Sequence, residues 1–424
     1  MRLTDEERAM LDGKQGRAIA RAMDFLVRYG EAVDAENLVD VNSVSVGIQK
    51  YDKLKPPYDD AGPFNAYFSE VYMDSPEVVE IPQVRANSCT ILHDMDSRYW
   101  QLQGVDEAVR DQTDYLEKCC NNIGLAPTFT CAPYLLGYIP LIGEHCSWME
   151  SSAVPMCNSV FGGRTNTEGM ESNGAAMITG KIPNWGYHLD ENRLGQYLIE
   201  VEYDLKSVRD WGLAGYYVGG VIQEKIPVYN GVKDIPNLRK MMVCSAGGAS
   251  SGGIEMYHIV GVTPEANTLE RAFGGKKPQD TLKLGKAELK QAYETLQTAS
   301  DPNVDFVMFG CPHYSLEEIW RVAMMLDGKH IADNSNLWIF TPDAIKTIAD
   351  RAGYTAIIEK AGGYIMCDTC PCIAHAVPKG AKIFATDSPK QAHHMHSILG
   401  LPAWYGTTED CVNAALTGKW KGEF

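Results

Sequence analysis

Hydrophobic and polar positions along the chain alternate between the spacing of helices and that of strands. Residues 4–7 read Thr-Asp-Glu-Glu, a capping-box pattern that predicts the start of a helix. Apolar residues at helical spacing over residues 19–27 continue this helix, and Gly30 is expected to end it. Residues 39–46 alternate apolar and polar side chains, which predicts a half-buried strand, and residues 105–123 predict another helix.

The last third of the chain has the clearest pattern. Short apolar runs at residues 305–310, 336–340, 363–366 and 382–385 predict buried strands, and helical stretches separate them. Strands that alternate with helices in this way are typical of parallel α/β sheets. The sequence therefore predicts an α/β fold with several parallel sheets.

Ligands of parallel α/β sheets bind beyond the carboxyl ends of the strands. Three segments are expected at such ends: Cys311, residues 367–370 and residues 386–390. A run rich in Gly and Ser at residues 245–253 lacks the Gly-Lys-Ser/Thr ending of a phosphate-binding loop. We interpret that run as a turn, or as a place where the backbone packs closely beside a ligand.

Length and charge restrict the class of protein. A chain of 424 residues is expected to form roughly two or three domains, which we place at residues 1–130, 131–300 and 301–424. The net charge of −17 opposes nucleic acid or a membrane as the main partner. The charged N-terminus lacks an apolar signal segment, and no apolar run is long enough to span a bilayer. We therefore expect a cytoplasmic location.

Twelve cysteines in such a chain favour packing, metal binding or catalysis over disulfides. Cys311 and Cys370 precede prolines, and Cys131 has a proline two residues later, a feature that recurs in iron–sulfur ligand runs. Separations of 180 and 59 residues exclude a local zinc ribbon, but a cluster site forms if the strand ends converge. Core cysteines are the alternative, and Cys367 with Cys370 also has the spacing of a redox dithiol.

The densest polar segment covers residues 150–166, where a carboxylate, hydroxyls, amides and a guanidinium stand among glycines. Its Arg164 offers a planar fork for a carboxylate or phosphate. A structural loop whose polar side chains cap helices would have the same composition. His393, His394 and His396 predict a hydrophilic helix face rather than a metal site.

This polar segment and several others, taken in order, resemble the aconitase X family, and more closely its large, catalytic subunit. The matching blocks are residues 150–166, 170–193, 258–266, 310–318, 368–371, 387–390 and 411–415. Together they span most of the chain. The resemblance implies an aconitase-like α/β fold, in which several parallel-sheet domains surround a central cleft.

The resemblance also implies a hydro-lyase, that is, a dehydratase that eliminates water from a small hydroxylated carboxylic acid. Family members include dehydratases of cis-3-hydroxyproline and of phosphorylated mevalonate. The family's three ligands of an iron–sulfur cluster, with either four irons or two, carry over to Cys131, Cys311 and Cys370. An iron with an open position would polarise the hydroxyl that leaves as water.

The base that removes the substrate proton is expected to be a serine on a swivelling domain, which in two-chain family members is a small companion subunit. The family blocks occupy this chain from Leu3 to Gly418, so we expect it to need such a partner. The resemblance further implies that Glu150, Ser151 and Lys390 are catalytic. The expected substrate-binding residues are Asn87, Ser88, Asn158, Ser159, Arg164, Thr165 and Ser388.

The chain departs from the family pattern in its N-terminal region, which we expect on the substrate side. Residues 43–47 lack a histidine that the family carries there, and residues 87–90 replace a pair of threonines. His93 is a candidate substitute for that imidazole, and residues 67–100 resemble the family least. These departures leave the substrate open. Two other functions are alternatives: a regulatory homologue without a cluster, and a zinc hydrolase that uses the same thiols.

Overall fold

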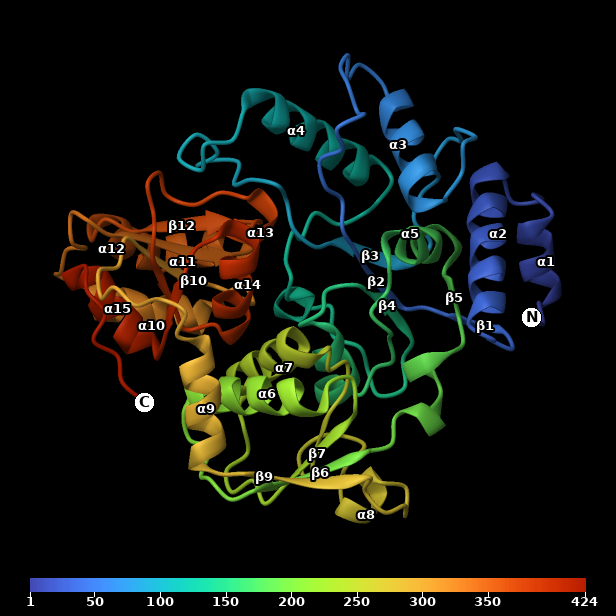
Figure 1. Cartoon of the computed structure of the whole chain (residues 1–424). Coiled ribbons are helices and arrows are strands. Elements are labelled where there is room, and N and C mark those ends of the chain that lie inside the picture. The colour runs from blue at the N-terminus through green and yellow to red at the C-terminus, as the bar shows by residue number, and fades with distance from the viewer.

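The computed structural model describes residues 1–424 and contains three parallel sheets, each with its own helices. The three α/β units surround the centre of the molecule, with the N-terminal unit at the right of Figure 1, the central unit below and the C-terminal unit at the left. An α/β fold with several parallel sheets is thereby confirmed. None of the helices combines the length and apolar character needed to cross a membrane.

The N-terminal unit contains the parallel sheet β3–β2–β4 and the antiparallel pair β1–β5. Its strands are β1 (Leu38–Asp40), β2 (Ser43–Val46), β3 (Asn87–Thr90), β4 (Cys146–Trp148) and β5 (Lys181–Pro183). Its helices are α1 (Asp5–Leu11), α2 (Arg17–Ala32), α3 (Gly62–Tyr72), α4 (Glu107–Asn122) and α5 (Met170–Thr179), with short turns η1 (Pro133–Leu136), η2 (Met156–Phe161), η3 (Gly186–His188) and η4 (Asp190–Asn192). The main sheet therefore takes strands from both sides of residue 130.

Two predictions for this region are wrong in detail. The first helix is divided into α1 and α2, because Gly13 and Gly16 between them adopt positive φ angles of 78° and 109°. Gly30 lies inside α2 and does not end it. The strand expected at residues 39–46 is two strands, and β2 is buried along its whole length. Full burial is typical of the middle strand of a parallel sheet.

The central unit contains the parallel sheet β8–β7–β6–β9, and the C-terminal unit contains the parallel sheet β12–β11–β10–β13–β14. The central elements are β6 (Tyr197–Val201), α6 (Val208–Ile222), β7 (Pro227–Asn230), α7 (Leu238–Gly252), β8 (His258–Ile259), α8 (Leu269–Ala272), β9 (Asp280–Leu284) and α9 (Lys286–Leu296). The C-terminal elements are β10 (Phe306–Phe309), α10 (Leu316–Leu326), β11 (Asn336–Thr341), α11 (Asp343–Arg351), α12 (Tyr354–Lys360), β12 (Tyr364–Cys367), α13 (Pro371–Ala374), β13 (Phe384–Thr386), α14 (Pro389–Leu399), β14 (Ala403–Tyr405) and α15 (Thr408–Thr417). The four strands predicted in this unit are confirmed.

The run at residues 245–253 is neither a turn nor a ligand loop, because it lies mostly in α7, which packs backbone to backbone against α6. A Cβ atom added at Gly215 of α6 would collide with the carbonyl of Cys244, and one at Gly252 would collide with the carbonyl of Gly219. Only glycine permits so close an approach. The pair matters for the site because α7 also packs on α14, whose first residues include Lys390.

This contact predicts opposite effects for two alanine substitutions on α6. Gly215→Ala should lower the free energy of unfolding by about 2–3 kcal/mol, because the added methyl group forces the two helices apart. Gly220→Ala should raise it by up to about 1 kcal/mol, because the nearest atom is 3.9 Å from the added Cβ and alanine favours a helix. Urea unfolding followed by circular dichroism measures both. Equal shifts for the two variants would contradict the close contact.

Candidate active site

Cys131, Cys311 and Cys370 come from separate segments that contact one another. Cys311 follows β10 and Cys370 follows β12, so both lie at the carboxyl edge of one parallel sheet. Cys131 comes from the N-terminal unit, and its Sγ accepts a hydrogen bond from the His313 backbone N–H at 3.3 Å. The strand ends therefore converge in the way that a site shared by distant cysteines requires.

The imidazole of His313 joins all three cysteine segments. It is fully buried, with Nδ1 3.1 Å from Thr130 Oγ1 and Nε2 2.9 Å from the carbonyl oxygen of Thr369. Burial lowers the pKa of His313 to about 4, so the ring is neutral near neutral pH. A carbonyl oxygen only accepts, so Nε2 carries the proton and Nδ1 accepts from the Thr130 hydroxyl. One side chain thus fixes the residues that precede Cys131 and Cys370.

Polar groups surround the three thiols. The His313 backbone N–H donates to Cys131 Sγ, and the Ile373 backbone N–H donates to the backbone carbonyl of Cys370 at 3.2 Å. Burial raises the pKa of all three thiols, and ionised neighbouring groups, including Cys311, raise the pKa of Cys131 and Cys370 further. The three thiols therefore lie within electrostatic reach of one another. Donors that point at sulfur favour the thiolate form that binds metal.

Lys390 is the charged centre beside these thiols. Its Nζ lies 2.5 Å from Glu150 Oε1 and donates to Ser151 Oγ at 2.9 Å. Glu150 Oε1 also accepts from the Ser152 hydroxyl at 3.1 Å. The structure thus brings the three side chains expected to be catalytic into direct contact, from the start of α14 and from the polar segment after β4.

Lys390 and Glu150 form an ion pair near neutral pH. Burial acts to lower the pKa of Lys390, but the charges of Glu150 and Cys311 outweigh burial and raise the pKa well above its ordinary value. Burial acts to raise the pKa of Glu150, but Lys390 and Ser152 lower it overall. Lys390 is therefore protonated, which suits the binding of an anion and not the removal of a proton. Its charge also lowers the pKa of Cys311 against the effect of burial.

Three of the predicted binding residues in the polar segment bond to the protein itself. Asn158 Nδ2 donates to the carbonyls of Thr165 and Glu255 at 2.9 and 3.0 Å. Ser159 Oγ accepts from the Tyr257 backbone N–H at 2.8 Å. Asn158, Ser159 and Thr165 are almost completely buried. Their contacts are those of a structural loop, and a role in substrate binding stays a prediction.

Arg164 also bonds to other residues of the protein. Its Nη1 donates to the carbonyl of His188 at 2.7 Å, and its Nη2 pairs with Asp190. The structure does not bring Arg164 into contact with Lys390. The fully buried arginine of this region is Arg193, whose guanidinium donates to backbone carbonyls at 2.9 to 3.0 Å. The fork of Arg164 is thus occupied by Asp190, and its binding of substrate stays a prediction.

Asn87 and Ser88 begin β3, whereas Thr90 ends it. The Thr90 carbonyl accepts from the Thr130 backbone N–H at 3.3 Å, so the end of β3 adjoins the segment of Cys131. At about 3.3 Å per residue, Asn87 lies roughly 10 Å back along the strand. The structure therefore places the end of β3, and not Asn87 or Ser88, beside the cysteines.

His93 is buried nearby, with its ring centroid 3.4 Å from that of Phe129. Burial lowers the pKa of His93 to about 3, so this ring is neutral too. Its backbone N–H donates to the carbonyl of Asp368 at 2.7 Å. His93 therefore ties the end of the N-terminal sheet to the segment before Cys370.

Comparison with known proteins places this arrangement in a family. Sequence models of the first, second and third domains of aconitase X match residues 1–191, 195–294 and 304–417. The chain belongs to the aconitase X family. Its fold matches the crystal structure of Thermococcus kodakaraensis aconitase X in the holo-form with a TM-score of 0.83 and 30% identity, over 98% of this chain and 100% of that one.

Two named relatives show the reaction class. The phosphomevalonate dehydratase large subunit of Methanocaldococcus jannaschii is 35% identical over 97% of this chain and 99% of its own length. The cis-3-hydroxy-L-proline dehydratase of Pseudomonas aeruginosa is 33% identical over 99% of this chain and 70% of its own length. Both are dehydratases of the aconitase X family, and this chain is a hydro-lyase of the same type.

The residues of this aconitase X chain include thiols of the kind that an iron–sulfur cluster would need. No three His, Cys, Asp or Glu side chains lie close enough together to hold one metal ion. Iron–sulfur clusters are held by cysteine thiolates. Cys131, Cys311 and Cys370 stand on segments that meet at His313, so they would supply three such ligands.

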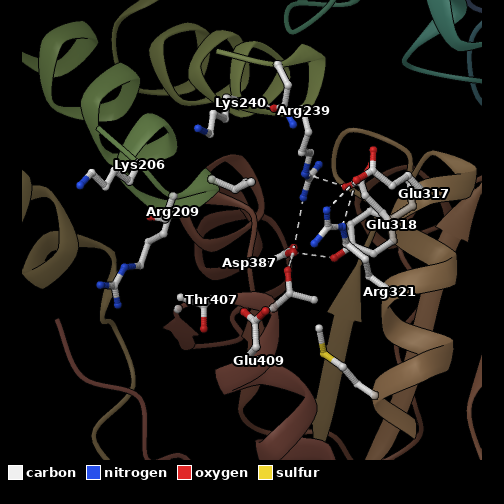
Figure 2. Close-up of a pocket in the computed structure, with 17 residues that line it drawn as sticks. Lys206, Arg209, Arg239, Lys240, Glu317, Glu318, Arg321, Asp387, Thr407 and Glu409 are labelled. Carbon is white, nitrogen blue, oxygen red and sulfur yellow. Dashed lines mark hydrogen bonds and ion pairs between the residues drawn. The ribbon is translucent and has the colours of Figure 1, made fainter. Parts of the chain in front are cut away.

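A second charged network supports the loop that carries Ser388 and Lys390. Arg239 of α7 lies 2.6 Å from Glu318 through Nε and 3.4 Å from Asp387 through Nη2, and the Tyr314 hydroxyl donates to Asp387 at 2.5 Å. Figure 2 shows these side chains at a cavity of about 310 Å³, which lies between the first residues of α6 and α7 and those of α10 and α15. Arg239 thus links the central unit to the C-terminal unit directly behind the site.

Sequence reasoning missed His313 and Arg239. A histidine two residues after a predicted ligand, in the order Cys-Pro-His, was a usable signal for His313. Nothing near Arg239 in the sequence marks it, because its partners Glu318 and Asp387 belong to another unit.

His313→Gln tests whether a neutral imidazole holds the segments of Thr130 and Thr369 together. The substitution removes the acceptor for the Thr130 hydroxyl, so it should lower the free energy of unfolding by about 1–3 kcal/mol at pH 7.5. As pH falls from 6.5, the ordinary pKa, towards about 4, the unfolded wild-type chain binds a proton that the folded one refuses. The wild type should therefore lose about 3 kcal/mol more than the variant over this interval.

Urea unfolding at several pH values measures this difference. His396→Gln, at an exposed position of α14, is the control and should leave both the stability and its pH dependence unchanged. Parallel pH profiles for wild type and His313→Gln would contradict a buried, neutral His313.

Proposed function

We propose that this chain is the large subunit of a dehydratase that uses an iron–sulfur cluster on Cys131, Cys311 and Cys370 to eliminate water from a small hydroxylated carboxylic acid. The observation that carries the proposal is that the segments of these three thiols meet at His313, at the edge of the sheet where α14 presents Lys390. When bound, such a cluster supplies an iron with an open position, a Lewis acid for the leaving hydroxyl.

The chain's own residues bind and orient the substrate. Lys390 is protonated and holds the anionic end of the substrate, and Glu150 keeps the ammonium group in place. Ser151 contacts the same ammonium group and adds a hydroxyl to the binding surface. Ser388 Oγ caps α14 by accepting from the Gln391 backbone N–H at 3.1 Å, so it fixes the start of the helix that presents Lys390.

The base belongs to a small swivelling subunit. Lys390 carries its proton near neutral pH, and the Glu150 carboxylate is engaged by Lys390 and Ser152, so neither suits the removal of a substrate proton. The names of the archaeal relatives include the words large subunit, and this chain spans 99% of one of them but 70% of the hydroxyproline enzyme. A partner that supplies a serine base fits the words large subunit in the names of these relatives.

The substrate is a small hydroxy acid whose carboxylate or phosphate meets Lys390. The two named substrates of the relatives, phosphomevalonate and cis-3-hydroxy-L-proline, both carry an anionic group. Because the chain departs from the family pattern at residues 43–47 and 87–90, a third hydroxy acid should be tested beside these two. A cytoplasmic location, where thiols stay reduced, fits twelve free cysteines.

Iron and acid-labile sulfide per chain test the cluster directly. Protein purified without oxygen should contain both, and Cys311→Ala should lose most of them because one thiolate ligand is gone. Cys411→Ala, at a buried cysteine of α15, is the control for loss of a thiol and should keep the iron. Zinc without sulfide, or no metal, would overturn the cluster and favour the hydrolase or the regulatory homologue.

Reconstitution with a small subunit tests whether that subunit supplies the base. The cluster-loaded chain alone should turn over neither phosphomevalonate nor cis-3-hydroxy-L-proline, because it lacks the base. Addition of a small subunit of the family should raise the rate of water loss from one hydroxy acid by at least about a hundredfold, the usual contribution of general base catalysis. Turnover by the chain alone at the full rate would refute the partner.

A further inference from the structure

The chain holds a fourth thiol at the predicted cluster site. Ten of the twelve cysteines are buried, and the two that are partly exposed, Cys370 and Cys372, stand two residues apart at the start of α13. Neither the family resemblance nor the named relatives assigns a role to Cys372. Its exposure distinguishes it from the cysteines that serve only to fill the core.

The residues that surround Cys372 belong to the predicted cluster site. Gln391 Nε2 donates to Cys372 Sγ at 3.4 Å, and Gln391 directly follows Lys390 on α14. Cys372 also packs against the hydrophobic cluster that contains Cys311. Its helix, α13, contacts α14. Cys372 therefore lies at the predicted cluster site, on the side of α14 and Lys390.

Cys367 provides the contrast. It is three residues from Cys370 in sequence, but its Sγ accepts from Arg98 Nη1 at 3.6 Å, and its backbone N–H donates to Asp96 at 2.5 Å. Its polar partners are therefore Arg98 and Asp96, which come from the N-terminal unit. The structure thus divides the cysteine-rich segment into Cys370 and Cys372 at the site and Cys367 outside it.

We propose that Cys372 is a fourth thiol ligand of the cluster, which binds the iron position left open by Cys131, Cys311 and Cys370 until substrate takes that position. The inference rests on the proposed cluster. Ligation replaces the S–H bond of Cys372 by an iron–sulfur bond, and the proton passes to water because the thiol is partly exposed. The Gln391 amide, which donates to the sulfur, holds the side chain ready in both states.

Thiol alkylation measures the ligation without any substrate. The apoprotein and the protein loaded anaerobically with ferrous iron and sulfide are treated with iodoacetamide, and peptides containing residues 370–372 are quantified by mass spectrometry. Cys370 and Cys372 should both react in the apoprotein, and loading should slow both at least tenfold. Unchanged reactivity of Cys372 on loading would overturn the proposal.

Variants separate ligation from simple shielding. Cys372→Ala should retain iron and sulfide, because three thiolates remain, whereas Cys370→Ala should lose most of both. The reduced cluster of Cys372→Ala should give an electron paramagnetic resonance spectrum with shifted g values, and Cys372→Ser should give a third spectrum, because an oxygen ligand replaces sulfur. Identical spectra for wild type and both Cys372 variants would show that Cys372 is a bystander.

The outcomes distinguish this inference from the function on which it rests. If the wild-type chain takes up no iron and sulfide, the cluster itself is refuted and the fourth ligand with it. If the chain loads but Cys372 stays reactive, or if its variants leave the spectrum unchanged, only the fourth ligand is refuted. The alkylation result on the wild type decides the matter even if a variant fails to fold.

Discussion

The site depends on one buried, neutral imidazole. His313 donates to the carbonyl of Thr369 and accepts from the hydroxyl of Thr130, and its own backbone N–H reaches Cys131. No covalent bond connects the three cysteine segments, so these hydrogen bonds set their spacing. A protonated ring would have no acceptor for Thr130 and would place a charge in a fully buried position, which is why burial keeps the pKa low.

Charge is distributed in opposite senses at the surface and at the site. The chain carries a net charge of −17, yet Lys390 and Arg239 are held in buried ion pairs at the thiols and behind them. Buried pairs of this kind contribute little net stability, because desolvation offsets the attraction. Their effect here is electrostatic: a fixed positive charge beside Cys311 favours the thiolate form, and it would attract the anionic substrate that we propose.

Sequence patterns predicted local features well and long-range ones poorly. The strands at residues 305–310 and 336–340 and the capping boxes follow from near neighbours in the chain, so they could be predicted. The strand order β12–β11–β10–β13–β14 and the bond of His313 to Thr130 depend on residues far apart in the chain. Composition also could not separate the residues of the 150–166 segment that face the site, such as Glu150, from those that only hold the loop, such as Asn158.

The site is complete only when all three α/β units are docked. Cys131 comes from the first unit and Cys311 from the third, and the α6–α7 pair of the second supports α14 and provides Arg239. The cluster proposed for these thiols would bind only in the docked arrangement, so its binding energy would add to the stability of that arrangement. Without a cluster, the glycine contact of α6 with α7 and the hydrogen bonds of His313 contribute to holding the segments that carry the thiols in place.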